Sequence, residues 1–236
     1  MNNFPSYLAL VIVAMFSLDS FAATVRVDFQ GVVDHVDASE GVNHDDYLGG
    51  KVVVGTPFSG SFHFDDSATD LGMGFVANTA VYQYQTPPNG MSVEIGGFTF
   101  RSDPLDTQFV IAVANNMEEL GGVGSGDTYA ISSVRDEIVV GSDGLMSFQP
   151  EIVLELSGDS SVRDSVELIT TPEGHGVYPN SRFAVQGFDV NDRDKSFLIH
   201  SGEVSFVVSV PEPASQSLLV FATGTAIIYI RRQTRR

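Results

Sequence analysis

The sequence predicts an all-β protein, an antiparallel, jelly-roll-like β-sandwich built from roughly a dozen short strands. Three observations predict this class. Apolar and polar residues alternate along most of the chain, which is the two-residue period of a half-buried strand. Gly, Pro and Asp interrupt these runs at short intervals, as turns do. Only residues 116–120 and 163–168 have a helical pattern, and both stretches are short.

The first element, residues 1–22, predicts a signal peptide. An apolar stretch over residues 8–16 is followed by Ser20, Phe21 and Ala22. Small residues at Ser20 and Ala22 suit cleavage by signal peptidase before Ala23. No Lys or Arg precedes the apolar stretch, so an uncleaved anchor is the alternative interpretation. A signal peptide indicates export from the cytoplasm.

Residues 23–209 predict one β-sandwich domain, long enough to bury a sizeable core. Residues 58–64 form the clearest strand, because Phe58, Phe62 and Phe64 alternate with polar residues. The continuous apolar run 108–114 predicts a strand that is buried on both faces, and Gly31 predicts a bulge after the first strand. Strands are expected at residues 25–29, 51–54, 58–64, 79–85, 91–95, 98–100, 108–114, 129–134, 137–140, 152–156, 183–188, 196–199 and 204–208.

Two local patterns make sharper predictions. Gly96 and Gly97 separate two alternating apolar runs, which is typical of a hairpin with a two-residue turn that needs positive φ. Tyr82 and Tyr84 share one face of their strand, so they form either part of the core or a surface platform for a ligand. The alternation favours the core.

The composition limits the partners. The formal net charge is −18, and the predicted domain is more acidic still because four of the arginines lie in the last residues of the chain. Such an acidic protein is not expected to bind nucleic acid or an anionic membrane surface. The chain has no Cys, which excludes disulfides, thiolate metal sites and cysteine nucleophiles, and it has no Trp to stack on sugars.

No catalytic constellation stands out. The run Gly122–Gly126 lacks a phosphate-binding lysine and has Val123 where a nucleophile elbow needs its first Gly, so a flexible loop is the simpler interpretation. The five histidines lack metal-ligand spacing and are expected to be solvated loop or surface residues. They are His35, His44, His63, His175 and His200. Carboxylate pairs for glycoside hydrolysis depend on a spatial separation that sequence does not give.

Calcium is the cofactor that the acidic loops suit best, because it takes six to eight oxygen ligands from flexible acidic segments. Solvated acidic loops that bind nothing are the alternative. Asp45 and Asp46 form a further acidic loop. The weak calcium candidates fall in two groups: Asp65, Asp66 and Asp70, and then Asp189, Asn191, Asp192 and Asp194.

The end of the chain has the most specific pattern. Two prolines, Pro211 and Pro213, keep a short segment extended, because proline fixes φ and cannot donate to a sheet ladder. An apolar run over residues 218–230 follows, and then Arg231 and Arg232. The run is shorter than the roughly 20 residues of a full membrane span, so a core element is the alternative. The Pro-rich break before it and the arginines after it favour a transmembrane segment that stops at the cytoplasmic face.

This tail, residues 210–236, resembles the PEP-CTERM sorting signal of Gram-negative bacteria. Pro211, Glu212 and Pro213 match the Pro-Glu-Pro motif of that family, and Val210, Ala214, Arg231 and Arg232 agree with it. The resemblance implies transient anchoring in the inner membrane and processing by an exosortase, a membrane-embedded transpeptidase-like enzyme. Members of the family are linked to exopolysaccharide and biofilm production.

Three functional hypotheses follow. The preferred one is an exported, non-catalytic β-sandwich that passes signal peptidase and an exosortase and reaches the cell envelope or the extracellular matrix. The second is a lectin-like module that binds polysaccharide, with or without calcium. The third is a small hydrolase of matrix polysaccharide, which would require clustered carboxylates in a cleft.

Overall fold

The computed structural model describes residues 24–38, 48–72, 78–117, 126–134, 136–140, 148–192 and 194–207. The predicted signal peptide, the acidic pair Asp45–Asp46 and the predicted sorting tail lie outside these residues. Within them, no helix combines the length and the apolar character that a membrane span needs.

Two antiparallel sheets form the described part of the chain, which confirms the predicted all-β sandwich. The first sheet has the order β13-β1-β3-β5-β6-β9, and the second has the order β2-β12-β11-β10-β8-β7-β4. The elements are β1 (Thr24–Val32), β2 (His35–Ala38), β3 (Pro57–Asp65), β4 (Thr79–Tyr84), β5 (Gly90–Ile95), β6 (Phe98–Arg101), β7 (Gln108–Met117), β8 (Gly126–Val134), β9 (Glu137–Val140), β10 (Phe148–Gly158), α3 (Pro172–His175), β11 (Asn180–Asp189), β12 (Ser196–Ser201) and β13 (Val204–Val207).

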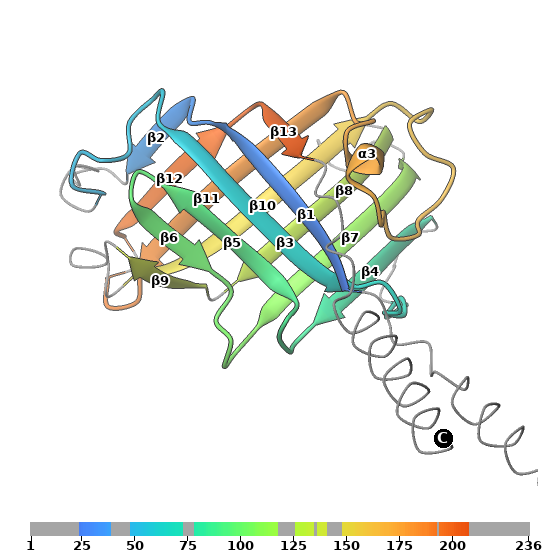
Figure 1. The fold of residues 1–236 in the computed structure, drawn as a ribbon, viewed down its shortest axis with the longest axis horizontal. Coiled ribbons are helices and arrows are strands. Elements are labelled where there is room, and N and C mark those ends of the chain that lie inside the picture. Colours follow the sequence, from blue (N-terminus) through green and yellow to red (C-terminus); the bar gives the residue numbers. More distant parts are fainter. Residues whose placement is uncertain are drawn as a thin grey trace, which may run out of the picture.

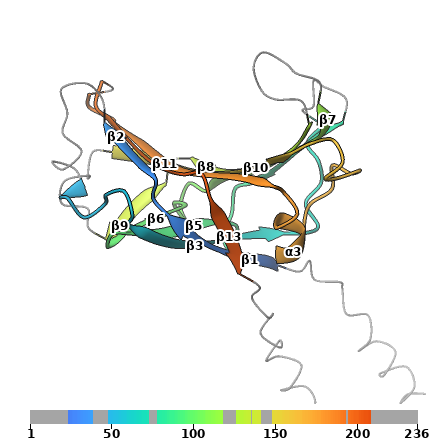
Figure 2. The same cartoon turned by 90° about the horizontal axis from the view of Figure 1, so that it is seen from above.

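The strands of the two sheets run across one another, as Figure 1 shows for β1 and β3 in front of β10 and β11. Figure 2 shows the two layers from above, with the seven-stranded sheet bending away from the other sheet at both ends. Aromatic side chains fill the space between the layers. Phe58 of β3 stacks on Phe183 of β11 with ring centroids 4.4 Å apart, so the aromatic core joins the two sheets directly.

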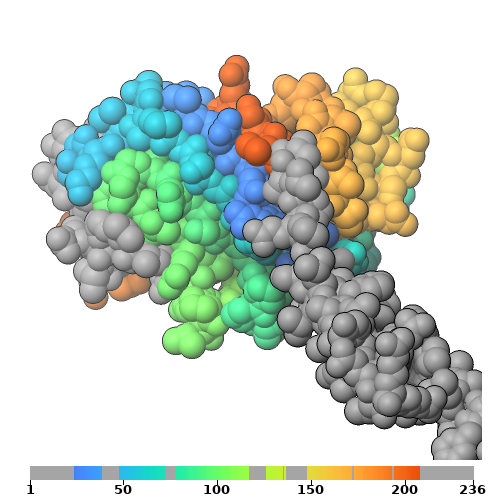
Figure 3. Space-filling view, in the orientation of Figure 1, coloured from blue at the N-terminus to red at the C-terminus, as the bar shows by residue number. Residues whose placement is uncertain are grey.

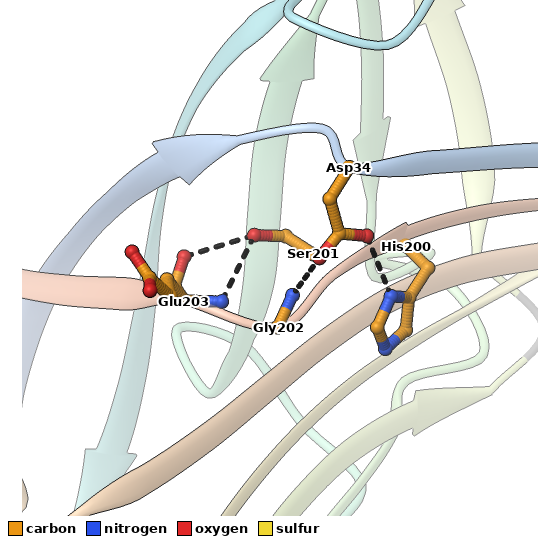
Figure 4. A network of polar contacts seen from close by, with 5 residues as sticks. All are labelled: Asp34, His200, Ser201, Gly202 and Glu203. Atoms are coloured by element: carbon orange, nitrogen blue, oxygen red, sulfur yellow. Dashed lines mark hydrogen bonds and ion pairs between the residues drawn. The ribbon is translucent and has the colours of Figure 1, made fainter.

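Two of the connections at which the chain changes sheet lie together at one corner. Between β1 and β2 the chain passes from the first sheet to the second, and between β12 and β13 it passes from the second sheet to the first. Such bends are how crossed sheets are closed at a corner. Asp34 joins the two connections (Figure 4): its Oδ1 accepts a hydrogen bond from His200 Nδ1 at 2.8 Å, and its Oδ2 accepts one from the Gly202 amide at 2.6 Å.

Several local predictions are confirmed. The Gly96-Gly97 turn joins β5 and β6, and both glycines have positive φ, at 58° and 87°. Tyr82 and Tyr84 are buried in the core, with 8% and 5% of their surface exposed, so they do not form a surface platform. All but one of the thirteen predicted strands coincide with an observed strand at least in part.

The exception is the predicted strand 51–54, which is wrong. Residues 51–56 instead form turns, in which the Lys51 amide donates to Leu48 O and the Thr56 amide donates to Val53 O. Val52 alone is buried, while Val53 and Val54 point outward, because glycines on both sides favour turns over a ladder. The sequence also missed β2, which is too short and too polar to show a period.

The helical predictions are wrong as well where the structure describes them. Residues 163–168 are not helical, and Asn116 and Met117 end strand β7 instead of starting a helix. Gly31 does not form a bulge, because the β1–β3 register continues through its pairing with Phe58. In β7 the residues 108–114 alternate between buried and partly exposed, so this strand is not buried equally on both faces.

Candidate functional site

The first acidic loop uses its carboxylates to hold its own backbone. Asp65 Oδ1 accepts hydrogen bonds from the amide and the hydroxyl of Ser67, at 2.8 and 2.6 Å. Asp70 Oδ1 accepts from the amides of Gly72 and Val81, at 3.0 and 2.9 Å, and so fixes the loop to the start of β4. Short polar side chains commonly cap turns in this way.

The second acidic loop is the tight turn between β11 and β12. Asp189 Oδ1 accepts a hydrogen bond from the Asn191 amide at 2.8 Å, and Asp192 forms an ion pair with Lys195 at 3.2 Å. Backbone hydrogen bonds join the same three positions, since the Lys195 amide donates to Asp192 O and the Asp189 amide donates to Lys195 O. Asp194 is exposed beside this turn.

The two acidic loops do not meet. One follows the end of β3 and the other joins β11 to β12, and Figure 1 shows these points at opposite ends of the sandwich. Among the residues that the structure describes, no group of three or more His, Cys, Asp or Glu side chains could hold a metal ion. The calcium prediction therefore stays a prediction, and these two loops do not build one shared site.

A chain of three polar side chains crosses the interior between the sheets. Asp136, which follows β8, is buried, and its Oδ1 accepts a hydrogen bond from Ser133 Oγ at 2.5 Å. Ser133 Oγ lies 2.5 Å from Ser102 Oγ, which in turn accepts from the Met91 amide of the opposite sheet. Asp136 Oδ2 accepts from the Ile152 amide at 3.1 Å. Each of the three side chains has a hydrogen-bond partner, and together they connect the two sheets.

Burial raises the pKa of Asp136 to about 7, although the hydrogen bonds from Ser133 and Ile152 oppose the rise. The carboxyl group therefore changes charge near neutral pH, inside the protein. Sequence reasoning missed Asp136, because one Asp after a strand looks like any surface turn residue. Its only sequence signal is the pair of adjacent serines, Ser132 and Ser133, shortly before it.

A cavity of about 290 Å³ lies between α3, the start of β11 and β13. His175 and Tyr178, at the end of α3 and just after it, line the cavity and are buried, with 1% and 7% of their surface exposed. Glu173, Gly176 and Ser205 line it from exposed positions. The cavity thus has an exposed rim and a buried polar floor.

The five histidines lie in different environments. His44 lies outside the described residues, while His35 and His200 lie at the corner of the sandwich. His63 is half-buried on the outer face of β3, and burial followed by the Arg26 charge lowers its pKa. The expectation of a solvated residue is wrong for His175, which inserts its ring between the sheets. Its ring centroid lies 5.4 Å from that of Phe62 and 5.3 Å from that of Tyr129.

The sorting-motif residues Val210, Pro211, Glu212, Pro213, Ala214, Arg231 and Arg232 lie outside the described residues. No protein-family model, no curated protein and no solved structure matches this chain.

Proposed function

We propose that this protein is an exported, non-catalytic β-sandwich that an exosortase-type enzyme processes at the Pro211-Glu212-Pro213 motif. Signal peptidase removes residues 1–22, and the segment 218–230 holds the protein transiently in the inner membrane until processing releases it to the cell envelope or to an exopolysaccharide matrix. The observation that carries the proposal is the order of the tail: an extended Pro-rich motif, an apolar run and terminal arginines.

The geometry of the domain ends supports this proposal. β1, which begins at Thr24, pairs antiparallel with β13, and Val207 at the end of β13 lies opposite Asp28. The first and last described residues therefore lie at the same end of the sandwich, on neighbouring strands. A domain attached to a membrane through either signal, or through both, would present the same end to it.

The positions at which the described strands begin and end support the proposal too. The first strand begins just after the predicted cleavage before Ala23, and the last described strand ends three residues before Val210. The described strands therefore begin after one predicted signal and end before the other. The chain passes between the two sheets at most of its connections, and we take this wrapping to be jelly-roll-like.

Intact-protein mass spectrometry of the protein from its native host tests the proposal. We expect a mass that lacks both residues 1–22 and the arginine tail. Substitution of the motif by alanines, Pro211→Ala with Glu212→Ala and Pro213→Ala, should leave the tail attached and the protein in the membrane fraction.

The matched control changes three residues just after the motif, Ser215→Ala with Gln216→Ala and Ser217→Ala, and it should be processed as the natural sequence is. If the motif variant lost its tail as efficiently as this control, the proposal would be wrong. A natural protein that keeps residues 218–236 would instead be a permanently anchored envelope protein.

A further inference from the structure

The cavity beside α3 has unpaired polar atoms in its floor. Figure 3 shows β13 and the segment that carries α3 on the same face of the molecule, and residues from both segments line the cavity. Nε2 of His175 is buried and has no hydrogen-bond partner, and the hydroxyl of Tyr178 is buried with no partner in full hydrogen-bonding geometry. Burying a polar atom without a partner is costly, so these groups in one cavity floor call for an explanation.

The chemistry of His175 is fixed by its other ring nitrogen. Nδ1 lies 2.9 Å from the carbonyl oxygen of Thr171, and a carbonyl oxygen only accepts, so Nδ1 carries the proton and donates. Burial lowers the pKa of His175 to about 4, which keeps the ring neutral at physiological pH. Nε2 therefore presents a lone pair that can accept a hydrogen bond and cannot donate one.

Tyr178 and Arg163, beside His175, differ from it in the hydrogen bonds that they can form. The Tyr178 hydroxyl can both donate and accept, and burial raises its pKa, which keeps it protonated. Arg163 lies beside Tyr178, where its charge and its hydrogen bonding to the hydroxyl lower that pKa in part. A guanidinium can only donate, so it faces the Tyr178 oxygen and leaves the hydroxyl proton available. The cavity floor thus offers one acceptor, His175 Nε2, and one donor, the Tyr178 hydroxyl.

We propose that this cavity binds one residue of a neutral saccharide. A hydroxyl group donates and accepts, so a ring that carries several hydroxyls can donate to His175 Nε2 and accept from the Tyr178 hydroxyl. An ammonium group offers no acceptor, and a sulfate dianion offers no donor to His175. A cavity of about 290 Å³ is of the size of a small ligand and not of a folded partner.

The rim suits the same ligand. The Glu173 carboxylate can accept from further hydroxyls, and the aromatic ring of Phe206 lines the cavity as an apolar wall. Because the floor atoms are buried, contact with them requires the β13 side of the rim to move outward. β13 has four residues and, among the described strands, pairs with β1 alone, so few ladder bonds hold this side of the rim.

This inference goes beyond the proposed sorting and does not depend on it, because binding is a property of the purified protein. The test uses the full chain in mild detergent, with ¹⁵N-labelled histidine. Methyl glycosides of glucose, galactose, mannose, rhamnose and N-acetylglucosamine are titrated while the His175 Nε2 resonance is followed. Putrescine, sulfate and diglycine serve as a cation, an anion and an amide of comparable or smaller size.

We expect at least one glycoside to shift the Nε2 resonance saturably, in the direction of a newly accepted hydrogen bond, while the three comparison compounds do not. Tyr178→Phe removes one polar group and keeps the ring. It should weaken binding about tenfold, read at the same His175 Nε2 resonance, which is the effect of one lost buried hydrogen bond.

Two further variants keep the test decisive. Ser205→Phe fills the cavity from an exposed position, so it should abolish binding without harming the fold. Tyr84→Phe removes a buried hydroxyl that donates to Asp65 O elsewhere in the sandwich, and it should bind as the natural sequence does. The inference is overturned if no glycoside moves the Nε2 resonance, if Ser205→Phe binds unchanged, or if diglycine, putrescine or sulfate gives the shift instead. It is also overturned if Nε2 already accepts a hydrogen bond without sugar and stays unchanged, since a bound water would then fill the floor.

Discussion

The ring of Phe29 covers Gly60, its direct partner across the β1–β3 ladder. A Cβ atom on Gly60 would lie 2.5 Å from the Phe29 ring and 2.7 Å from the backbone oxygen of Ser92. The relationship repeats one step along the ladder, where the Phe58 ring covers Gly31. Each pair packs a large ring against bare backbone, and the two rings meet edge to face, with an angle of 62° between their planes.

This packing predicts that Gly60→Ala destabilises the protein by about 2–3 kcal/mol, because overpacking a close-fitted core costs energy and one clash is with backbone that cannot rotate away. Urea unfolding followed by circular dichroism measures the change. Ser61→Ala, on the next residue and on the outer face of the same strand, is the control and should change stability by under about 0.5 kcal/mol. Equal stability of the two variants would show that the strands move apart freely.

A second prediction concerns the corner at Asp34. Burial is the largest single influence and raises the pKa of Asp34, but the hydrogen bonds from His200 and Gly202 and the nearby histidine charges together outweigh it, so the pKa lies below its ordinary value. Half of the Asp34 side chain is exposed, so water can replace these bonds. We expect Asp34→Ala to cost about 1 kcal/mol and to speed hydrogen exchange at the Gly202 amide and along β13.

Asp37→Ala is the control for the corner, because Asp37 lies in β2 and caps only the amide of the next residue. It should leave exchange along β13 unchanged. If Asp34→Ala also left that exchange unchanged, the corner would be held by the backbone bond from the Asp34 amide to His200 O instead.

More of the fold than of the candidate site could be predicted from the sequence, for physical reasons. Period-two patterns report a buried face, so strands such as β3 and β5 are visible in the sequence. The turns after Leu48 and the short β2 are not, because tertiary contacts and not periodicity decide them. Buried polar groups escape prediction most completely. Asp136 and His175 look like ordinary turn and loop residues until distant segments are packed around them.

The buried carboxyl group of Asp136 predicts a pH dependence. Its folded pKa of about 7 lies above its ordinary value of 3.8, so between these values the folded state binds more protons than the unfolded state. The contribution of Asp136 to stability is complete below about pH 4 and is lost as pH rises through 7. The loss is about 4 kcal/mol if the whole shift is realised.

Asp136→Asn should remove this loss. The Asn amide can accept from the Ile152 amide with its oxygen and donate to Ser133 with its nitrogen, so both partners stay satisfied. We therefore expect the variant to be more stable than the natural protein above about pH 7 in urea unfolding. Asp136→Ala leaves the same partners unpaired and should be less stable at every pH, while Asp164→Asn, at an exposed carboxylate, should change nothing. An Asn variant as unstable as the Ala variant would show that the charged form is the one that the fold requires.

His175 predicts the opposite slope over the same pH range. Its folded pKa of about 4 lies below the ordinary 6.5, so the folded state binds fewer protons between these values, and stability present above about pH 6.5 is lost as pH falls toward 4. The loss is about 3 kcal/mol at full shift, which nearly cancels the gain from Asp136. The natural protein should therefore change little in stability between about pH 4 and 7, although two buried groups titrate within it.

The variants separate the two contributions. His175→Phe removes one of the two slopes, so this variant should become more stable as pH falls, while Asp136→Asn should become less stable. The double variant should again be nearly flat. Unfolding measured at about pH 4.5 and about pH 7.5 for the four proteins checks this pattern, and parallel curves for the two single variants would contradict it.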